Sequence, residues 1–128
     1  MSDSDQAIVS WIEDNVGGTV TSISRQPRWR PVWWVTLDHD GELRELCVRG
    51  ERTDMEMVMP LRHEMVLQEV MWEHGIPVPR IHGWINHPAA YVMDKVPGRN
   101  DFTGVDDATR AAVVDDYVAI LARLHSLD

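Results

Sequence analysis

The chain has 128 residues, of which 44% are hydrophobic and 26% are charged, and its formal net charge at pH 7 is −9. This length fits one domain or part of one, and the composition is ordinary for a soluble globular protein. The negative charge argues against nucleic acid or an anionic membrane surface as the main partner.

The cysteine content and the first residues bear on the cellular compartment. Cys47 is the only cysteine, so no intrachain disulfide can form. Residues 1–5 are acidic and lack the basic, apolar start of a signal peptide. No apolar run approaches the ~20 residues that a membrane-spanning helix needs. These features predict a cytoplasmic protein.

The chain begins with a predicted helix followed by a strand. Apolar residues recur at helical spacing over 5–16, with Ser4 as the expected N-cap and Gly17 at the end. The β-branched residues at 19–23 then predict a strand.

A cation-rich loop is predicted at 26–31, because its two prolines cannot sit inside a sheet. It contains Arg28 and Arg30 and directly follows Arg25, so three of the twelve basic residues lie close together. Such a loop is either solvated, with its charges balanced by nearby carboxylates, or a contact for an anion.

A hairpin is predicted over 32–49. Strands at 32–37 and 43–49 flank a turn at 38–41 that ends in Asp-Gly. We expect the two strands to pair antiparallel in the middle of a sheet. Residues 50–59 then form an irregular link.

The next predicted helix starts at Pro60 and ends near His74, before Gly75. Glu64 lies beside one row of this helix. A carboxylate near apolar residues is costly unless a cation or donor meets it, so Glu64 either faces water or pairs with a cation. The row consists of Leu61, Met65, Gln68 and Trp72.

Two more strands are predicted at 80–85 and 90–93, after an extended connector at 76–79. Asp106 or Asp107 can cap a final helix. No stop signal follows this helix, so the chain looks cut off at its end. The apolar stripe of the helix comprises Ala111, Val114, Val118, Leu121 and Leu124. The six histidines lack ligand spacing, so we predict no metal site.

Three motifs occur in a specific order and spacing. They are Gly-Ile-Pro-Val-Pro at 75–79, Val-Met-Asp at 92–94 with Pro97 and Gly98 after it, and Leu-Ala-Arg-Leu-His at 121–125. Together they resemble the N-terminal lobe of the aminoglycoside phosphotransferase family, whose fold is similar to that of protein kinases. The resemblance covers roughly residues 19–128.

The resemblance implies an α+β fold with an antiparallel five-stranded sheet. A helix precedes the sheet, a second helix packs on it, and a C-terminal helix follows the hinge. The kinase-like lobe would span 1–96. Residues 97–128 would be the hinge linker and the first helix of a second lobe.

The resemblance also implies roles for single residues. Arg49 stands where the family has the basic residue of the third strand that contacts nucleotide phosphates, and Glu64 stands where a helix carboxylate pairs with it. The planar fork of Arg49 could engage Glu64 in two hydrogen bonds. Met93 matches the back of the adenine pocket. Asp94 and Val96 match the hinge positions whose backbone carbonyl and N–H hold adenine.

The loop at 26–31 departs from the family pattern. There, glycine and serine usually let backbone N–H groups approach phosphate. This loop has no glycine, and its two prolines lack N–H groups. Phosphate contact would therefore come mainly from the side chains of Arg28 and Arg30.

The function that the resemblance implies is nucleotide binding within a small-molecule phosphotransferase. The complete enzyme would use ATP or GTP with Mg²⁺ and phosphorylate a hydroxyl acceptor. The family's His-Gly-Asp catalytic loop and Mg²⁺-binding Asp lie downstream and have no match here. We therefore assign no catalytic or metal-binding residue and expect no turnover by this chain alone.

An alternative function is a stand-alone binding module that keeps the shape of the lobe without using nucleotide. The glycine-free loop favours it. Under either function the final helix lacks the second lobe that it packs against in the family. We therefore expect self-association through its apolar stripe.

Overall fold

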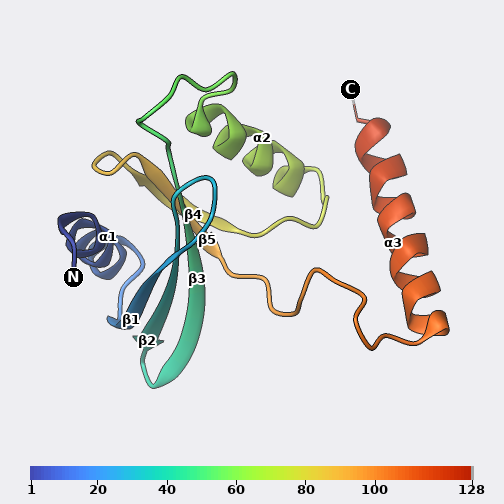
Figure 1. Ribbon diagram of the computed structural model, residues 1–128, viewed down its shortest axis with the longest axis horizontal. Coiled ribbons are helices and arrows are strands. Elements are labelled where there is room, and N and C mark those ends of the chain that lie inside the picture. Colours follow the sequence, from blue (N-terminus) through green and yellow to red (C-terminus); the bar gives the residue numbers. More distant parts are fainter. Residues whose placement is uncertain (128) are drawn as a thin grey trace.

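The computed structural model describes residues 1–127 as an α+β fold, with three helices and a five-stranded antiparallel sheet in that part of the chain (Figure 1). The predicted fold class is confirmed. In chain order the elements are α1 (Asp3–Asn15), β1 (Thr19–Gln26), β2 (Val32–His39), β3 (Glu42–Gly50), α2 (Leu61–Glu73), β4 (Ile81–Ile85), β5 (Ala90–Asp94) and α3 (Asp107–His125).

The strands are ordered β1-β2-β3-β5-β4, and every neighbouring pair is antiparallel. The predicted β2–β3 hairpin is therefore central. Strand β1 runs three residues further than predicted, because its ladder with β2 continues until Gln26 lies opposite Val32. The loop before β2 spans 27–31, one residue less than the predicted 26–31.

The register across the sheet decides which side chains share a face. Trp34 lies opposite Cys47, and Cys47 lies opposite Met93. Residues directly opposite each other point to the same side of a sheet, and neighbours along a strand alternate. Trp34, Cys47 and Met93 therefore share one face with Arg49 and Tyr91, which also lie opposite each other.

The opposite face carries the main hydrophobic core, which α1 covers (Figure 1). Ile8 and Ile12 of α1 are fully buried against it. Their spacing of four residues places both on one side of the helix. The other buried members are Trp33, Val35, Leu37, Leu46, Val48, Ile85, Ala90 and Val92.

Helix α1 starts with a capping box made by Ser2 and Asp5, so the predicted cap at Ser4 is wrong. The side chain of each residue accepts a hydrogen bond from the backbone N–H of the other. The Trp33 indole N–H also donates to Asp5, at 2.8 Å. Partial burial opposes ionisation of Asp5, but the hydrogen bonds from Ser2 and Trp33 outweigh it and lower the pKa of the carboxyl.

Helix α2 packs on the second face, mainly over β4 and β5. Its buried residues are Leu61 and Met65, which contact Tyr91. Trp72, predicted in the same row, is exposed. Pro60 is extended and immediately precedes the helix rather than forming its first residue.

Helix α3 stands apart from the sheet (Figure 1), and none of its residues is buried. Asp106 caps it by accepting a hydrogen bond from the Thr109 N–H at 2.7 Å, as predicted. Arg123 donates a hydrogen bond to the carbonyl of Gly75, just after α2. In the described residues, no helix combines the length and the apolar character that crossing a membrane requires.

Candidate functional site

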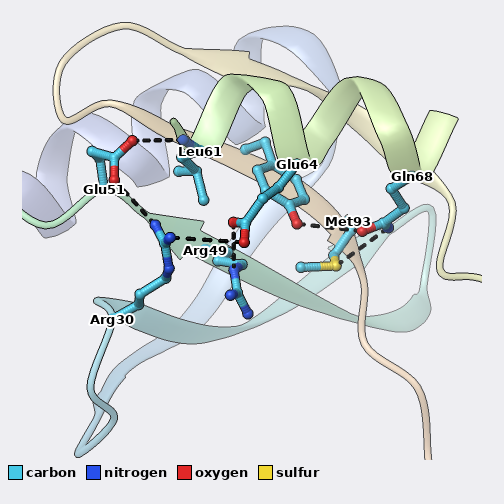
Figure 2. A network of polar contacts seen from close by, with 8 residues as sticks. Arg30, Arg49, Glu51, Leu61, Glu64, Gln68 and Met93 are labelled. Carbon is cyan, nitrogen blue, oxygen red and sulfur yellow. Dashed lines mark hydrogen bonds and ion pairs between the residues drawn. The ribbon is translucent and has the colours of Figure 1, made fainter. Parts of the chain in front are cut away.

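Four charged side chains meet on the α2 face of the sheet (Figure 2). They are Arg30, Arg49, Glu51 and Glu64, and we call them the charged cluster. Arg30 comes from the loop between β1 and β2, Arg49 from the end of β3, Glu51 from the residue after β3, and Glu64 from the first turn of α2. Three separate segments of the chain therefore supply this cluster.

Glu64 lies between two arginines, so it meets cations rather than only water. Its Oε1 lies 3.7 Å from Arg30 Nη2, and its Oε2 lies 3.6 Å from Arg49 Nε. The predicted pairing of Glu64 with Arg49 is present, but the two hydrogen bonds are not, because 3.6 Å is too long for one. Both Arg49 Nε and Glu64 Oε2 are buried without a hydrogen-bond partner in the described part of the chain.

Arg49 is held by only one of its guanidinium nitrogens. Figure 2 shows its two terminal amino groups turned away from the Glu64 carboxylate. The side chain is 37% exposed. Those amino groups have the planar arrangement that suits bidentate contact with a phosphate or carboxylate.

The two arginines of the β1–β2 loop point in different directions. Arg28 is exposed, whereas Arg30 is 7% exposed. Arg30 Nη1 donates to Glu51 Oε1 at 3.0 Å, and the second oxygen of Glu51 accepts from the Leu61 N–H at 2.7 Å. Contact of Arg28 or Arg30 with phosphate stays a prediction, and Arg30 already has two carboxylate partners.

The hinge residues Asp94 and Val96 line a groove of about 750 Å³. The Asp94 N–H donates to the Arg80 carbonyl at 2.9 Å, and the Lys95 N–H donates to the Glu45 carbonyl at 3.1 Å. These bonds fix the start of the hinge against its neighbours. Within residues 1–127 the Val96 N–H makes no hydrogen bond, so it remains a donor for a ligand. The remaining lining comes from Arg44, Glu45, Pro77, Val78, Pro79, Arg80, Lys95 and Pro97.

Met93 lies outside this groove, beneath α2. Its sulfur is 3.7 Å from Gln68 Nε2, which also donates to the Pro79 carbonyl at 2.8 Å. The Tyr91 hydroxyl donates to Gln68 Oε1 at 3.3 Å. Gln68 therefore joins α2 to β5 and to the connector before β4. The groove does not include Arg49, Glu64 or Arg28 either, so the hinge and the charged cluster are separate parts of one face.

Trp34 and Lys95 were not predicted as site residues. The Lys95 ammonium lies 4.0 Å from the centre of the Trp34 ring, and Trp34 is 36% exposed. The pair crosses the sheet from the hinge to β2, on the face that carries Arg49. A signal existed in the sequence: because side chains alternate along a strand, only one of the adjacent residues Trp33 and Trp34 can face the core. Glu51 gave no such signal, since it lies in an irregular link.

Cys47 lies on this face between Trp34 and Met93 and is half-buried. Burial raises the pKa of the Cys47 thiol, although the nearby cations Arg49, Lys95 and Arg28 oppose the shift. Three positive side chains from different segments therefore act electrostatically on this thiol.

No group of three or more His, Cys, Asp or Glu side chains able to hold a metal ion occurs in residues 1–127.

Comparison with known proteins identifies the chain at family level. Residues 26–128 match the family described as the phosphotransferase enzyme family. No curated protein and no solved structure gives a significant match. The matched region starts at the last residue of β1 and includes the charged cluster and the hinge. It also confirms the resemblance seen in the sequence motifs. The chain belongs to the phosphotransferase enzyme family.

Proposed function

We propose that the chain is the nucleotide-binding lobe of a small-molecule phosphotransferase. The reaction would move the γ-phosphoryl group of ATP or GTP to a hydroxyl acceptor. The observation that carries this proposal is Arg49, which is held on β3 by Glu64 while its terminal amino groups face away from that carboxylate. The lobe would span 1–96, and 97–128 would connect it to a second lobe. A reducing cytoplasm suits its single cysteine.

The spacing along β3 supports one orientation of the nucleotide. Asp94 lies opposite Leu46, and Arg49 follows three residues later. Three residues of a strand span about 10 Å, which suits the distance from a nucleobase to its phosphates. The base would bind the Asp94 carbonyl and the Val96 N–H, with Met93 behind it.

Two other side chains fit this orientation. Trp34 offers an aromatic surface between the hinge and Arg49, against which the base can pack once Lys95 moves. Arg28 is the exposed arginine of the loop and would reach the phosphates as a second cation. Acceptor activation and Mg²⁺ ligation would come from groups outside this chain, so the chain alone should bind nucleotide without turning it over.

Isothermal titration with ATP and GTP, each with Mg²⁺, tests the proposal. Arg49→Gln removes the charge and the fork, so we expect nucleotide affinity to fall roughly tenfold to a hundredfold, the usual effect of losing a charge-assisted contact. Arg110→Gln, on α3, is the matched control because it removes the same charge away from the charged cluster. Equal affinities for the wild type and Arg49→Gln would contradict the assigned role of Arg49.

A second candidate function is a binding module with the shape of the lobe and no use of nucleotide. The observation that favours it is the β1–β2 loop, which lacks glycine and turns Arg30 inward to Glu51 and Glu64. If the folded wild type binds neither ATP nor GTP, this second function is the better explanation.

We also propose that α3 mediates self-association, because none of its residues is buried and four of its large hydrophobic side chains are exposed. At high concentration, light scattering should give a mass above that of one chain. Val118→Asp should return it to the monomer, whereas Val58→Asp, in the link before α2, should not. A wild-type monomer at every concentration would contradict the proposal. The exposed large hydrophobic residues of α3 are Val113, Val114, Tyr117 and Val118.

A further inference from the structure

Arg30 is the one buried charged residue in the described part of the chain. Removing a charge from water is costly, so a buried arginine persists only where carboxylates compensate it. The residues just before it, 27–29, are exposed. The loop therefore turns the Arg30 side chain into the protein, while residues 27–29 stay exposed.

The first partner of Arg30 connects the loop to the start of α2. Glu51 binds Arg30 Nη1 through one oxygen, at 3.0 Å, and the Leu61 N–H through the other, at 2.7 Å. The first N–H groups of a helix have no partner within the helix. Pro60, at the N-cap, makes no side-chain hydrogen bond to supply one. Glu51 therefore caps α2, and Arg30 holds Glu51 in place.

The second partner of Arg30 is the carboxylate that faces Arg49. Arg30 Nη2 lies 3.7 Å from Glu64 Oε1, and Arg49 Nε lies 3.6 Å from Glu64 Oε2 (Figure 2). A cation beside one oxygen restricts rotation of the carboxylate and so orients the other oxygen. The orientation of Glu64 toward Arg49 therefore depends on Arg30.

We propose that Arg30 is a positioning residue for the phosphate contact made by Arg49. With Glu51 and Glu64 it forms the Arg30 bridge, which fixes the β1–β2 loop to the first turn of α2 and aims Glu64 at Arg49. Arg30 does not itself touch the ligand. The bridge holds in place a loop whose prolines and missing glycine leave few backbone N–H contacts for phosphate. This inference rests on the proposed nucleotide-binding function.

Arg30→Lys tests the bridge, because lysine keeps the charge but lacks the planar fork that reaches two carboxylates. We expect the affinity for ATP with Mg²⁺ to fall about tenfold, as for contacts within one ion-pair network. The affinity for adenosine, which has no phosphate, should stay at the wild-type value. Glu51→Gln should give the same selective loss while still offering an oxygen to Leu61.

Arg52→Lys is the matched control. Arg52 also binds a carboxylate in two hydrogen bonds, to Asp54 at 2.9 and 2.7 Å, but it lies outside the Arg30 bridge. The Arg52→Lys variant should bind ATP and adenosine with the same affinities as the wild type. An equal loss of affinity for both ligands in Arg30→Lys would indicate a purely structural role, and unchanged affinity for both would exclude a positioning role for Arg30. Both results would overturn the inference while leaving the proposed function intact.

Hydrogen exchange tests the bridge without a ligand. The Leu61 amide should exchange faster in Arg30→Lys than in Arg52→Lys, because Glu51 loses the partner that positions it. Unchanged exchange would overturn the bridge. If the wild type binds neither ligand, the proposed nucleotide function fails, and the exchange rates still decide whether the bridge exists.

Discussion

Leu46→Ala should lower the free energy of unfolding by about 3 kcal/mol, the typical cost of removing a buried leucine side chain. Leu46 is fully buried on β3, between β2 and β5, and belongs to the core that α1 covers. The strands on both sides limit how far the structure can relax into the cavity. Urea unfolding followed by circular dichroism measures the change.

Leu43→Ala is the matched control for Leu46→Ala, since it makes the same substitution on the same strand. Leu43 is 66% exposed, and changes at exposed positions usually stay within about 0.5 kcal/mol. Similar losses from the two variants would mean that the main core does not lie on the α1 face.

Gly18→Ala should destabilise the protein at least as much as Leu46→Ala. We expect backbone strain and overpacking together to lower the free energy of unfolding by about 3 to 4 kcal/mol. Gly18 has a φ of +74°, which residues with a Cβ rarely adopt. A Cβ at this position would also lie 2.4 Å from the Asp38 carbonyl oxygen. That oxygen is backbone in the β1–β2 ladder, so it cannot move aside as a flexible side chain could.

Gly104→Ala separates the two causes. Gly104 has a φ of +73°, but nothing lies within 4 Å of the position that the alanine methyl group would take. The Gly104→Ala variant should lose only the stability that backbone strain costs, about 1 kcal/mol. Thermal unfolding of both variants gives the comparison. Equal losses would show that the close approach between Gly18 and Asp38 contributes nothing.

Local sequence patterns were sufficient for most of the fold. Alternation and turn residues predicted the β2–β3 hairpin, and its central place in the sheet follows from the same pattern. Local sequence patterns did not predict where some of the helices and strands begin and end. Strand β1 reaches Gln26 because its partner strand continues, and α1 begins at Asp3 because Ser2 and Asp5 complete a reciprocal cap. Both outcomes depend on competition between neighbouring groups.

The candidate site was predictable where a residue's place on its own element decides its role. The positions of Arg49 on a strand and Glu64 on a helix, together with the family motifs, predicted that the two residues pair. The structure brings them together. The burial of Arg30 could not be predicted, because it depends on carboxylates 21 and 34 positions further along the chain. Composition alone left this arginine as either a solvated charge or an anion contact.

The length and direction of a contact are also beyond sequence patterns. Glu64 was predicted to accept two hydrogen bonds from Arg49, yet only Arg49 Nε faces it, at 3.6 Å. The partner that shares the carboxylate is Arg30. A second cation beside the Glu64 carboxylate changes the geometry of its contact with Arg49. The periodicity of α2 gives no indication that Arg30 lies there.

Side chains alternate between two faces along β3, and this separates the residues that decide folding stability from those that decide ligand preference. Leu46 and Val48 face the core, whereas Cys47 and Arg49 lie on the opposite face, which α2 covers in part. Libraries randomised at Leu46 and Val48 would sample the ability to fold. Libraries randomised at Cys47 and Arg49 would sample ligand preference, with little effect on folding. A one-residue insertion between Leu46 and Arg49 would exchange the faces and damage both properties at once. Directed evolution of this strand should therefore accept substitutions and reject length changes.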